Sequence, residues 1–292
     1  MRTFIFTFFF ILMLSAVSFM SCDKVEEPYM NVATVVDTVI CPLPQFDTFT
    51  PTRKVLLEEF TGHKCPNCPG ASALAAQLED QYQGQLVLKA IHSGYFAIPD
   101  NDGLFTTDFT TDAGDAIASN FGIVLNPVGM VNRMPYNGNV VLNPGDWVSA
   151  IDDIINQPPQ IYIQLQAIEA ADGEGDICIH AKTHFLETLN GNYYLVITIT
   201  ENNITAAQKT NDPNYPDGEI PDYSHNHVLR HAVNGPWGVE ISAGNVEAGT
   251  TFINSYQISP KDAWDIANCK IVAYVYNCSE EIVQVQEIDL MP

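Results

Sequence analysis

The chain has few basic residues. Only 12 of its 292 residues are Lys or Arg, against 35 Asp and Glu, and the formal net charge is −23. A surface this anionic repels phosphate, which excludes a nucleic-acid binder that relies on a general basic surface and argues against docking on anionic lipid. Disorder is excluded too, because 46% of the residues are hydrophobic. The length allows one large or two ordinary domains.

Apolar runs long enough to span a membrane are absent after the N-terminus. The run at residues 4–20 follows Arg2 and is short for a membrane span, so it predicts a signal peptide over residues 1–21. The approach to Cys22, Phe-Met-Ser, resembles the lipobox at which bacterial lipoproteins are cleaved and acylated. We therefore expect Cys22 to carry lipid that anchors an extracytoplasmic protein to a membrane. A plain thiol after an ordinary secretory peptide is the alternative.

The chain from Cys22 onward is expected to have three segments. Residues 22–52 are punctuated by proline and predict a tether and lead-in, with one strand near residues 32–40. Residues 53–157 are expected to form an α/β domain. The Gln-Pro-Pro sequence at 157–159 breaks a helix, and residues 158–292 are expected to form an all-β domain.

The strongest chemical signal is Cys65-Pro66-Asn67-Cys68. It follows a strand beginning at residue 54 and a glycine turn, and it opens a helix whose apolar face includes Ala71, Leu74 and Leu78. A CxxC motif alone is a weak signal, but a strand, a loop and then a helix is the context of a redox pair. A static disulfide, or a metal site completed by His63 and His92, stays open as an alternative.

Three further features predict a thioredoxin-like fold around this motif. Glu59 and Phe60 stand where thioredoxins carry a buried acid and a phenylalanine, and a strand at 86–91 follows at the distance of a βαβ unit. Residues 121–128 resemble the thioredoxin segment that contains a cis-proline, which predicts Pro127 as that residue. A strand at 128–132, a hairpin and a closing helix should follow. That helix should be capped by Asn143, with Pro144 first and inward residues Trp147, Ile151, Ile154 and Ile155.

The motif predicts a division of labour between the two thiols. Cys65 would lie at the helix N-terminus, where the dipole stabilises a thiolate with help from Lys64 and His63, and would attack a disulfide. Cys68 would be the resolving thiol, with Glu59 as its proton acceptor. These basic residues, with Arg53 and Lys54, predict a small basic island in an acidic protein.

In the last 135 residues, the hydrophobic pattern changes to a period of two. Six segments are expected to be strands and to form an antiparallel sandwich of immunoglobulin-like type: 161–168, 175–185, 193–201, 251–258, 270–277 and 281–290.

Two sets of residues in this part have open roles. His225, His227 and His231 could bind a metal, with the last two on one helix face, but a surface or packing role is the preferred interpretation and no cofactor is expected. Four further cysteines allow three pairings, among which a bond between two residues of one continuous strand is disfavoured. These are Cys41, Cys178, Cys269 and Cys278.

The segments 57–69, 126–133 and 225–230 together resemble the outer-membrane-protein-28 family of lipoproteins. The resemblance implies a cell outer membrane location, periplasmic or surface-facing, with a thioredoxin-like domain before an all-β domain. The chain lacks the Trp that working thioredoxins carry before the first cysteine, has Asn126 before the expected cis-proline, and carries residues 97–120 as an insertion. These departures alter the face that would bind a substrate.

We expect thiol–disulfide exchange on cysteine-containing envelope proteins, with no preferred redox direction. The alternative is a non-enzymatic surface lipoprotein that binds a ligand or host component through its β-sandwich, with the CPNC pair as a structural disulfide.

Overall fold

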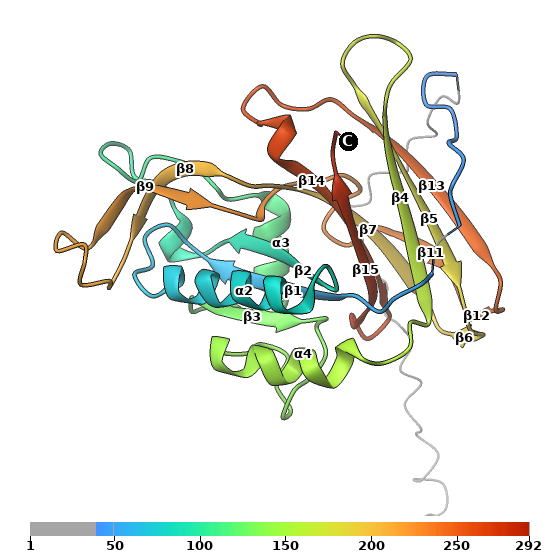
Figure 1. Cartoon of the computed structure of the whole chain (residues 1–292), viewed down its shortest axis with the longest axis horizontal. Helices are drawn as coiled ribbons and strands as arrows, with labels where there is room; N and C mark the ends of the chain where they lie inside the picture. The colour runs from blue at the N-terminus through green and yellow to red at the C-terminus, as the bar shows by residue number, and fades with distance from the viewer. Residues whose placement is uncertain (1–38, 49, 292) are drawn as a thin grey trace, which may run out of the picture.

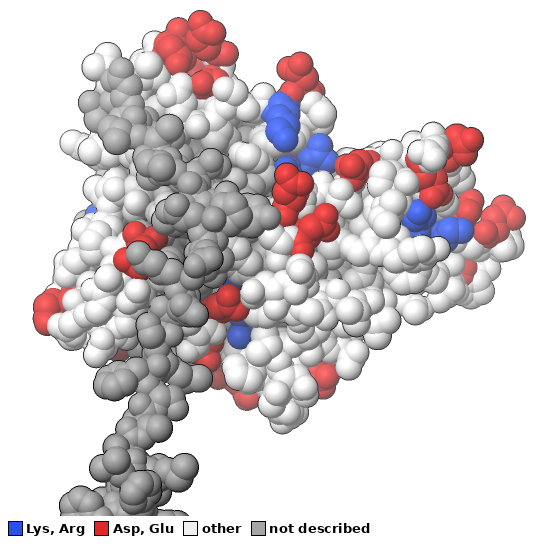
Figure 2. Space-filling view, turned by 180° about the vertical axis from the view of Figure 1, so that it is seen from behind, with Lys and Arg blue, Asp and Glu red and all other residues white. Residues whose placement is uncertain are grey.

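The computed structural model describes residues 39–48 and 50–291. The expected signal peptide, Cys22 and most of the tether, including most of the strand expected at 32–40, lie outside these residues. No helix in the described part of the chain is both long and apolar enough to cross a membrane. Acidic side chains are scattered over one face of the molecule, with a few basic ones among them (Figure 2). The negative charge is therefore spread over that face.

The first half of the described chain is built on a parallel pair of strands. Strand β1 (Val55–Thr61) leads to helix α2 (Cys68–Tyr82), which returns to strand β2 (Leu86–His92). Every residue of both strands is buried, as parallel strands covered on both faces require. Strand β3 (Val128–Val131) runs antiparallel to β1. The expected βαβ unit and the strand after Pro127 are confirmed.

Two 3₁₀ turns and two helices complete this half. The segment after β2 contains a 3₁₀ turn, η1 (Tyr95–Ala97), and helix α3 (Asp112–Asn120). Helix α4 (Trp147–Ile155) buries all four residues expected to face inward. The expected cap is wrong, because the Asn143 side chain accepts no capping hydrogen bond and a 3₁₀ turn, η2 (Pro144–Asp146), precedes α4. Trp147 lies against Gly129, where a Cβ atom would come within 2.9 Å of the indole.

The second half is rich in β-strands, as its period of two predicts. One antiparallel sheet contains β4 (Ile161–Glu169), β5 (Ile177–Phe185) and β13 (Thr251–Ile258). The facing strands are β7 (Tyr193–Glu201), β14 (Cys269–Asn277), β15 (Ile282–Asp289) and β11 (Val239–Ser242). A hydrophobic core drawn from both sheets fills the space between them. A small pair, β6 (Leu189–Asn190) and β12 (Asn245–Val246), and a 3₁₀ turn, η3 (Ile266–Asn268), complete this part. The immunoglobulin-like type stays a prediction.

One sheet joins the two halves (Figure 1). Strand β10 (Val228–Ala232) lies between β7 and β2, giving the order β15-β14-β7-β10-β2-β1-β3. The backbone N–H of Ala90 donates to the carbonyl of His227, 2.8 Å away. The chain passes from α4 to β4 close to the expected boundary after residue 157, yet the sheet continues across the two halves. The helix expected to hold His227 and His231 is wrong, because His231 lies in β10 and His227 in the turn before it.

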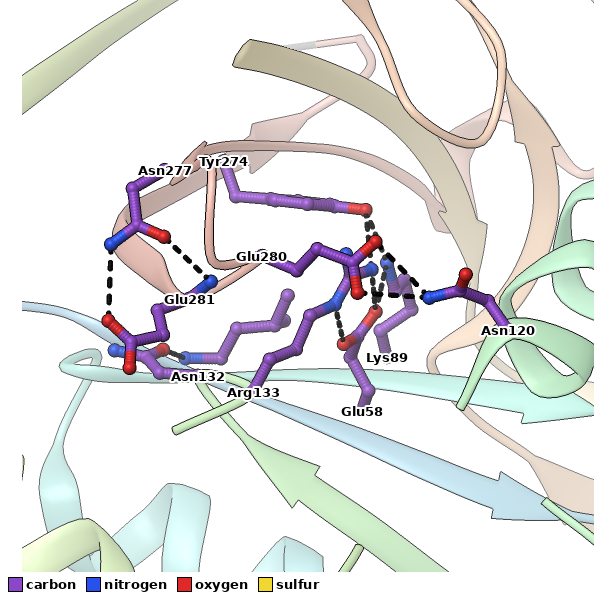
Figure 3. Close-up of polar contacts among 10 residues, drawn as sticks. Glu58, Lys89, Asn120, Asn132, Arg133, Tyr274, Asn277, Glu280 and Glu281 are labelled. Atoms are coloured by element: carbon purple, nitrogen blue, oxygen red, sulfur yellow. Dashed lines mark hydrogen bonds and ion pairs between the residues drawn. The ribbon is translucent and has the colours of Figure 1, made fainter. Parts of the chain in front are cut away.

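A buried charge cluster also joins the halves (Figure 3). Arg133, which follows β3, donates to Glu58 on β1 over 2.7 Å and to the Tyr274 hydroxyl on β14 over 3.1 Å. The Lys89 ammonium on β2 lies 3.0 Å from the other oxygen of Glu58. The Glu58, Lys89 and Arg133 side chains have no exposed surface. Burial raises the pKa of Glu58, but Arg133 and then Lys89 outweigh burial and lower that pKa to about 2. The carboxylate is therefore ionised and compensates two buried cations.

Candidate functional site

The CPNC motif forms a disulfide at the start of α2. Cys65 and Cys68 are bonded to each other, with 5.4 Å between their Cα atoms, and Cys68 is the first residue of the helix. The backbone N–H of Cys65 donates to the carbonyl of Gly62, which closes the turn before the helix. Because a pair of bonded cysteines cannot also serve as two thiolate ligands, this state does not form the alternative metal site.

Gly62 fixes the turn against the segment after β2. A Cβ atom at this position would lie 2.6 Å from the carbonyl carbon and oxygen of Phe96. The backbone N–H of Lys64 donates to that same carbonyl over 3.0 Å. The absence of a side chain at Gly62 therefore allows the CPNC turn to lie directly on η1.

The residue before Pro127 ties the ends of the two parallel strands together. The Asn126–Pro127 peptide bond is cis, as predicted. The Asn126 side chain donates to the carbonyl of Thr61 over 3.0 Å and to that of Ser93 over 3.1 Å. Asn126, which departs from the residues usual in thioredoxins, thus satisfies two backbone carbonyls near the CPNC turn.

Glu59 lies beneath α2 on the strand that leads to the motif. Burial raises its pKa to about 7, and the hydroxyl of Ser72 opposes this by donating a 2.7 Å hydrogen bond to it. Ser72 follows Cys68 by one helical turn on the same face of α2. Glu59 and Ser72 line a cavity of about 170 Å³ together with His92, Tyr223 and His225. The predicted proton acceptor is therefore a buried carboxyl group that titrates near neutral pH.

The expected basic island is wrong. Arg53 and Lys54 precede β1 and bind β15, where Arg53 donates to the Val283 carbonyl and Lys54 to the Gln286 side chain. Lys64 forms a 2.7 Å ion pair with Asp100. Each of these cations binds a group other than the CPNC motif. The position of its backbone in the fold decides which groups its side chain can contact, and closeness to the motif in sequence does not.

His63 is part of an aromatic cluster. Its ring stacks on Phe105 and packs against Phe109, whose other ring neighbours are His92 and His225. Burial, and then Lys64, lowers the pKa of His63, so its imidazole is neutral at pH 7 and adds no positive charge to the motif. The described residues hold no group of three or more His, Cys, Asp or Glu arranged to bind a metal ion. His92 and His225 instead pack edge to face, with 5.6 Å between their ring centroids, and Phe109 packs against both.

A β-hairpin from the second half covers the motif. Cys65 and Cys68 are each only 1% exposed. The hairpin consists of β8 (Ile204–Lys209) and β9 (Glu219–His225), which among the described strands pair only with each other. The Gln208 side chain donates to the carbonyl of Cys65 over 2.9 Å. We did not expect this contact, since neither the short β8 nor β9, which contains Pro221, has the pattern of a strand packed on another domain.

The remaining cysteines are now placed. Cys41 and Cys178 form a disulfide, with 5.5 Å between their Cα atoms, that fastens the segment before β1 to strand β5. Cys269 and Cys278 are free, the first buried and the second exposed. Cys269 begins β14 and Cys278 directly follows its last residue, so the length of the strand separates them, in line with the disfavoured pairing.

The comparisons identify relatives in fold. The chain is similar to HBP35 of Porphyromonas gingivalis, with 19% identity and a TM-score of 0.60 over 83% of this chain and 77% of that one. Protein AGR_C_4864 from Agrobacterium tumefaciens gives 14% identity and a TM-score of 0.50 over 83% and 96%. A domain of the outer membrane lipoprotein Omp28 from Porphyromonas gingivalis is 24% identical over 45% and 88%, with a TM-score of 0.30. No curated protein matches the chain.

A family model covers most of the chain after the motif. The model of outer membrane protein Omp28 matches residues 114–291, which is more than half of the chain and excludes Cys65 and Cys68. Lipid on Cys22 stays a prediction, because that residue lies outside the described part. The chain therefore belongs to the Omp28 family of outer membrane proteins, which confirms the location expected from the sequence.

Proposed function

We propose that the first half of this protein is a thioredoxin-like domain that performs thiol–disulfide exchange on cysteine-containing envelope proteins. The observation that carries the proposal is the position of the Cys65–Cys68 disulfide at the N-terminus of α2. The parallel β1–α2–β2 unit, the antiparallel β3 and the cis Asn126–Pro127 peptide support it. A helix N-terminus stabilises a thiolate, which favours Cys65 as the sulfur that reacts with a partner.

The exchange step begins from the disulfide that the structure contains. A thiolate of a partner protein attacks the Cys65 sulfur, the Cys65–Cys68 bond breaks, and Cys68 leaves as a thiolate. A second thiolate of the partner then attacks the partner sulfur that is bonded to Cys65. The mixed disulfide breaks, and Cys65 leaves as a thiolate. The partner loses two electrons and becomes a disulfide, while the CPNC pair gains them and becomes a dithiol. The reverse sequence reduces a partner disulfide.

Glu59 supplies the proton that this step needs. Its raised pKa of about 7 keeps a large share of the carboxyl group protonated at neutral pH. The protonated form can give its proton to the leaving Cys68 thiolate, and the carboxylate can take it back in the reverse direction. The hydrogen bond from Ser72, one turn beyond Cys68, holds the carboxyl group at this part of the helix.

The test is catalysis of insulin reduction in the presence of dithiothreitol. We expect the wild-type protein to accelerate insulin reduction and Cys65→Ala to abolish the acceleration. Cys278→Ala is the matched control, because it removes an exposed free thiol and should retain full activity. Cys68→Ala should accumulate mixed disulfides with a cysteine-containing peptide. A wild-type protein with no activity above the Cys65→Ala background would refute the proposal.

A second candidate function is favoured by the burial of the motif. Both cysteines are 1% exposed, which suits a structural disulfide in a surface protein that binds a ligand through its β-sandwich. In that case, the Cys65–Cys68 bond stays intact at reductant concentrations that reduce an accessible disulfide. The two candidates thus differ in one measurable property, the reactivity of this bond in the folded protein.

A further inference from the structure

The CPNC turn is covered through a row of backbone hydrogen bonds. The backbone N–H of Lys209 donates to the carbonyl of His63 over 2.8 Å, and that of Asn211 to the carbonyl of Pro66 over 3.1 Å. The Gln208 side chain fills the interval by donating to the carbonyl of Cys65 over 2.9 Å. Residues 208–211 therefore pair with the turn much as an added extended strand would pair.

One side-chain contact extends the row onto the motif itself. The Asn211 amide donates to the side-chain oxygen of Asn67, between the two cysteines, over 2.6 Å. Gln208 is 2% exposed, so its amide is removed from water and depends on the carbonyls of the turn. These contacts come from the loop end of the hairpin, and they lay residues 208–211 on the turn that holds the buried disulfide.

The hairpin is attached to the molecule more weakly than the strands of either sheet. Strands β8 and β9 form a separate two-stranded sheet, and no third strand within residues 39–48 and 50–291 pairs with them. Every residue of the connecting loop, 211–217, is exposed, and so are several residues of β9. Figure 1 shows the hairpin extending from the body beside the start of α2. A two-stranded hairpin is only marginally stable by itself, so it can open while both sheets stay folded.

We infer that the β8–β9 hairpin is a displaceable cover, which closes the Cys65–Cys68 disulfide and admits a reacting thiol only when residues 208–211 leave the CPNC turn. This inference rests on the proposed exchange function, whose reactive site the cover regulates. A displaceable cover explains why a redox motif lies at the start of a helix and yet has cysteines that a partner cannot contact in the closed state. A partner that offers an extended segment to the same carbonyls competes with the hairpin for them.

The test measures how fast the disulfide is reduced in the folded protein. The probe is tris(2-carboxyethyl)phosphine, which attacks one sulfur, breaks the bond and ends as a phosphine oxide with oxygen taken from water, leaving two thiols. Alkylation and mass spectrometry then count the thiols on each peptide. Four hydrogen bonds that residues 208–211 donate to the turn, at about fivefold each, predict reduction roughly 600-fold slower than in a disulfide-bonded peptide of residues 62–69.

Two variants loosen the cover. Gln208→Ala removes the bond to Cys65, and Asn211→Ala removes the bond to Asn67, so each should accelerate reduction about fivefold. Asn214→Ala is the matched control, because its side chain bonds only within the exposed loop, to Asp212, and it should reduce at the wild-type rate.

A second disulfide separates local opening from unfolding. Cys41–Cys178 is also buried but belongs to the other sheet, so its reduction should not change in either variant. Reduction of both disulfides at equal, raised rates would mean global unfolding and would overturn the cover, as would reduction of the wild type at the peptide rate. Equal rates for Gln208→Ala, Asn211→Ala and Asn214→Ala would overturn it too. Insulin reduction is scored separately: if it is absent in every variant while the reduction rates respond as expected, the exchange function fails and the cover stands.

Discussion

Replacing Glu58 by Gln should destabilise the protein strongly. The substitution keeps the size and one hydrogen-bond acceptor but removes the negative charge that contacts two cations, Lys89 and Arg133, whose side chains have no exposed surface. Leaving a buried charge uncompensated costs about 3–5 kcal/mol. The lowered pKa leads to a similar figure, since a fall from 4.5 to about 2 corresponds to about 3 kcal/mol.

The neighbouring carboxyl group provides the matched control, because its pKa moves in the opposite direction. A lowered folded-state pKa means that Glu58 contributes stability above about pH 4.5 and loses that contribution as the pH falls toward 2. The raised pKa of Glu59 means that its favourable contribution is complete below about pH 4.5 and is lost as the pH rises through about 7. At pH 8, Glu59→Gln should therefore be neutral or stabilising.

The assay is urea unfolding at pH 8 and pH 5, followed by circular dichroism, of the chain with Cys22→Ala. We expect a loss of about 3–5 kcal/mol for Glu58→Gln at both pH values. Adding Lys89→Met to Glu58→Gln should restore part of that loss, because one of the two uncompensated cations is gone. A loss below about 1 kcal/mol, or a loss no larger than that of Glu59→Gln, would refute the reasoning.

Three further predictions concern other parts of the chain. Cys41→Ser should lower the free energy of unfolding, measured by urea, by up to about 5 kcal/mol, because the bond to Cys178 closes a loop of 137 residues; an unchanged midpoint would show that the unfolded chain gains little freedom. Gly62→Ala should displace the CPNC turn, since the new Cβ would meet Phe96 at 2.6 Å, and should lower insulin reduction at least tenfold if exchange occurs. Cys22→Ala should move the protein from the membrane to the soluble fraction on immunoblots, and continued membrane attachment would argue against lipid on that residue.

The elements that local pattern encodes could be predicted from the sequence. A continuous apolar strand, a CxxC with proline in the first helical turn and a second apolar strand predict β1, α2 and β2, since each depends on residues close in sequence. The cis peptide before Pro127 follows from a short motif. The long strands of the second half follow from their period of two.

The contacts between the halves could not be predicted in this way. Strand β10 is only five residues long, and its position beside β2 depends on a partner far away in the sequence. The loop end of the β8–β9 hairpin binds backbone carbonyls of the CPNC turn, and carbonyls are present at every residue, so no side-chain pattern indicates the contact. The prediction of a basic island was wrong for a related reason. Its residues are close in sequence, but strand β1 separates Arg53 and Lys54 from His63 and Lys64.

The shared sheet sets an order for folding after export. Strands β1 and β2 are available as soon as residue 92 has crossed the membrane, but the free edge of β2 stays unpaired until residues 228–232 arrive. An open strand edge is a site of mispairing with other chains, and this one stays open until strand β10 is delivered. The Cys65–Cys68 bond, between residues three apart, can form during this interval, before residues 208–211 exist outside the membrane to cover it. The order of the chain therefore allows the motif to be oxidised before it is covered.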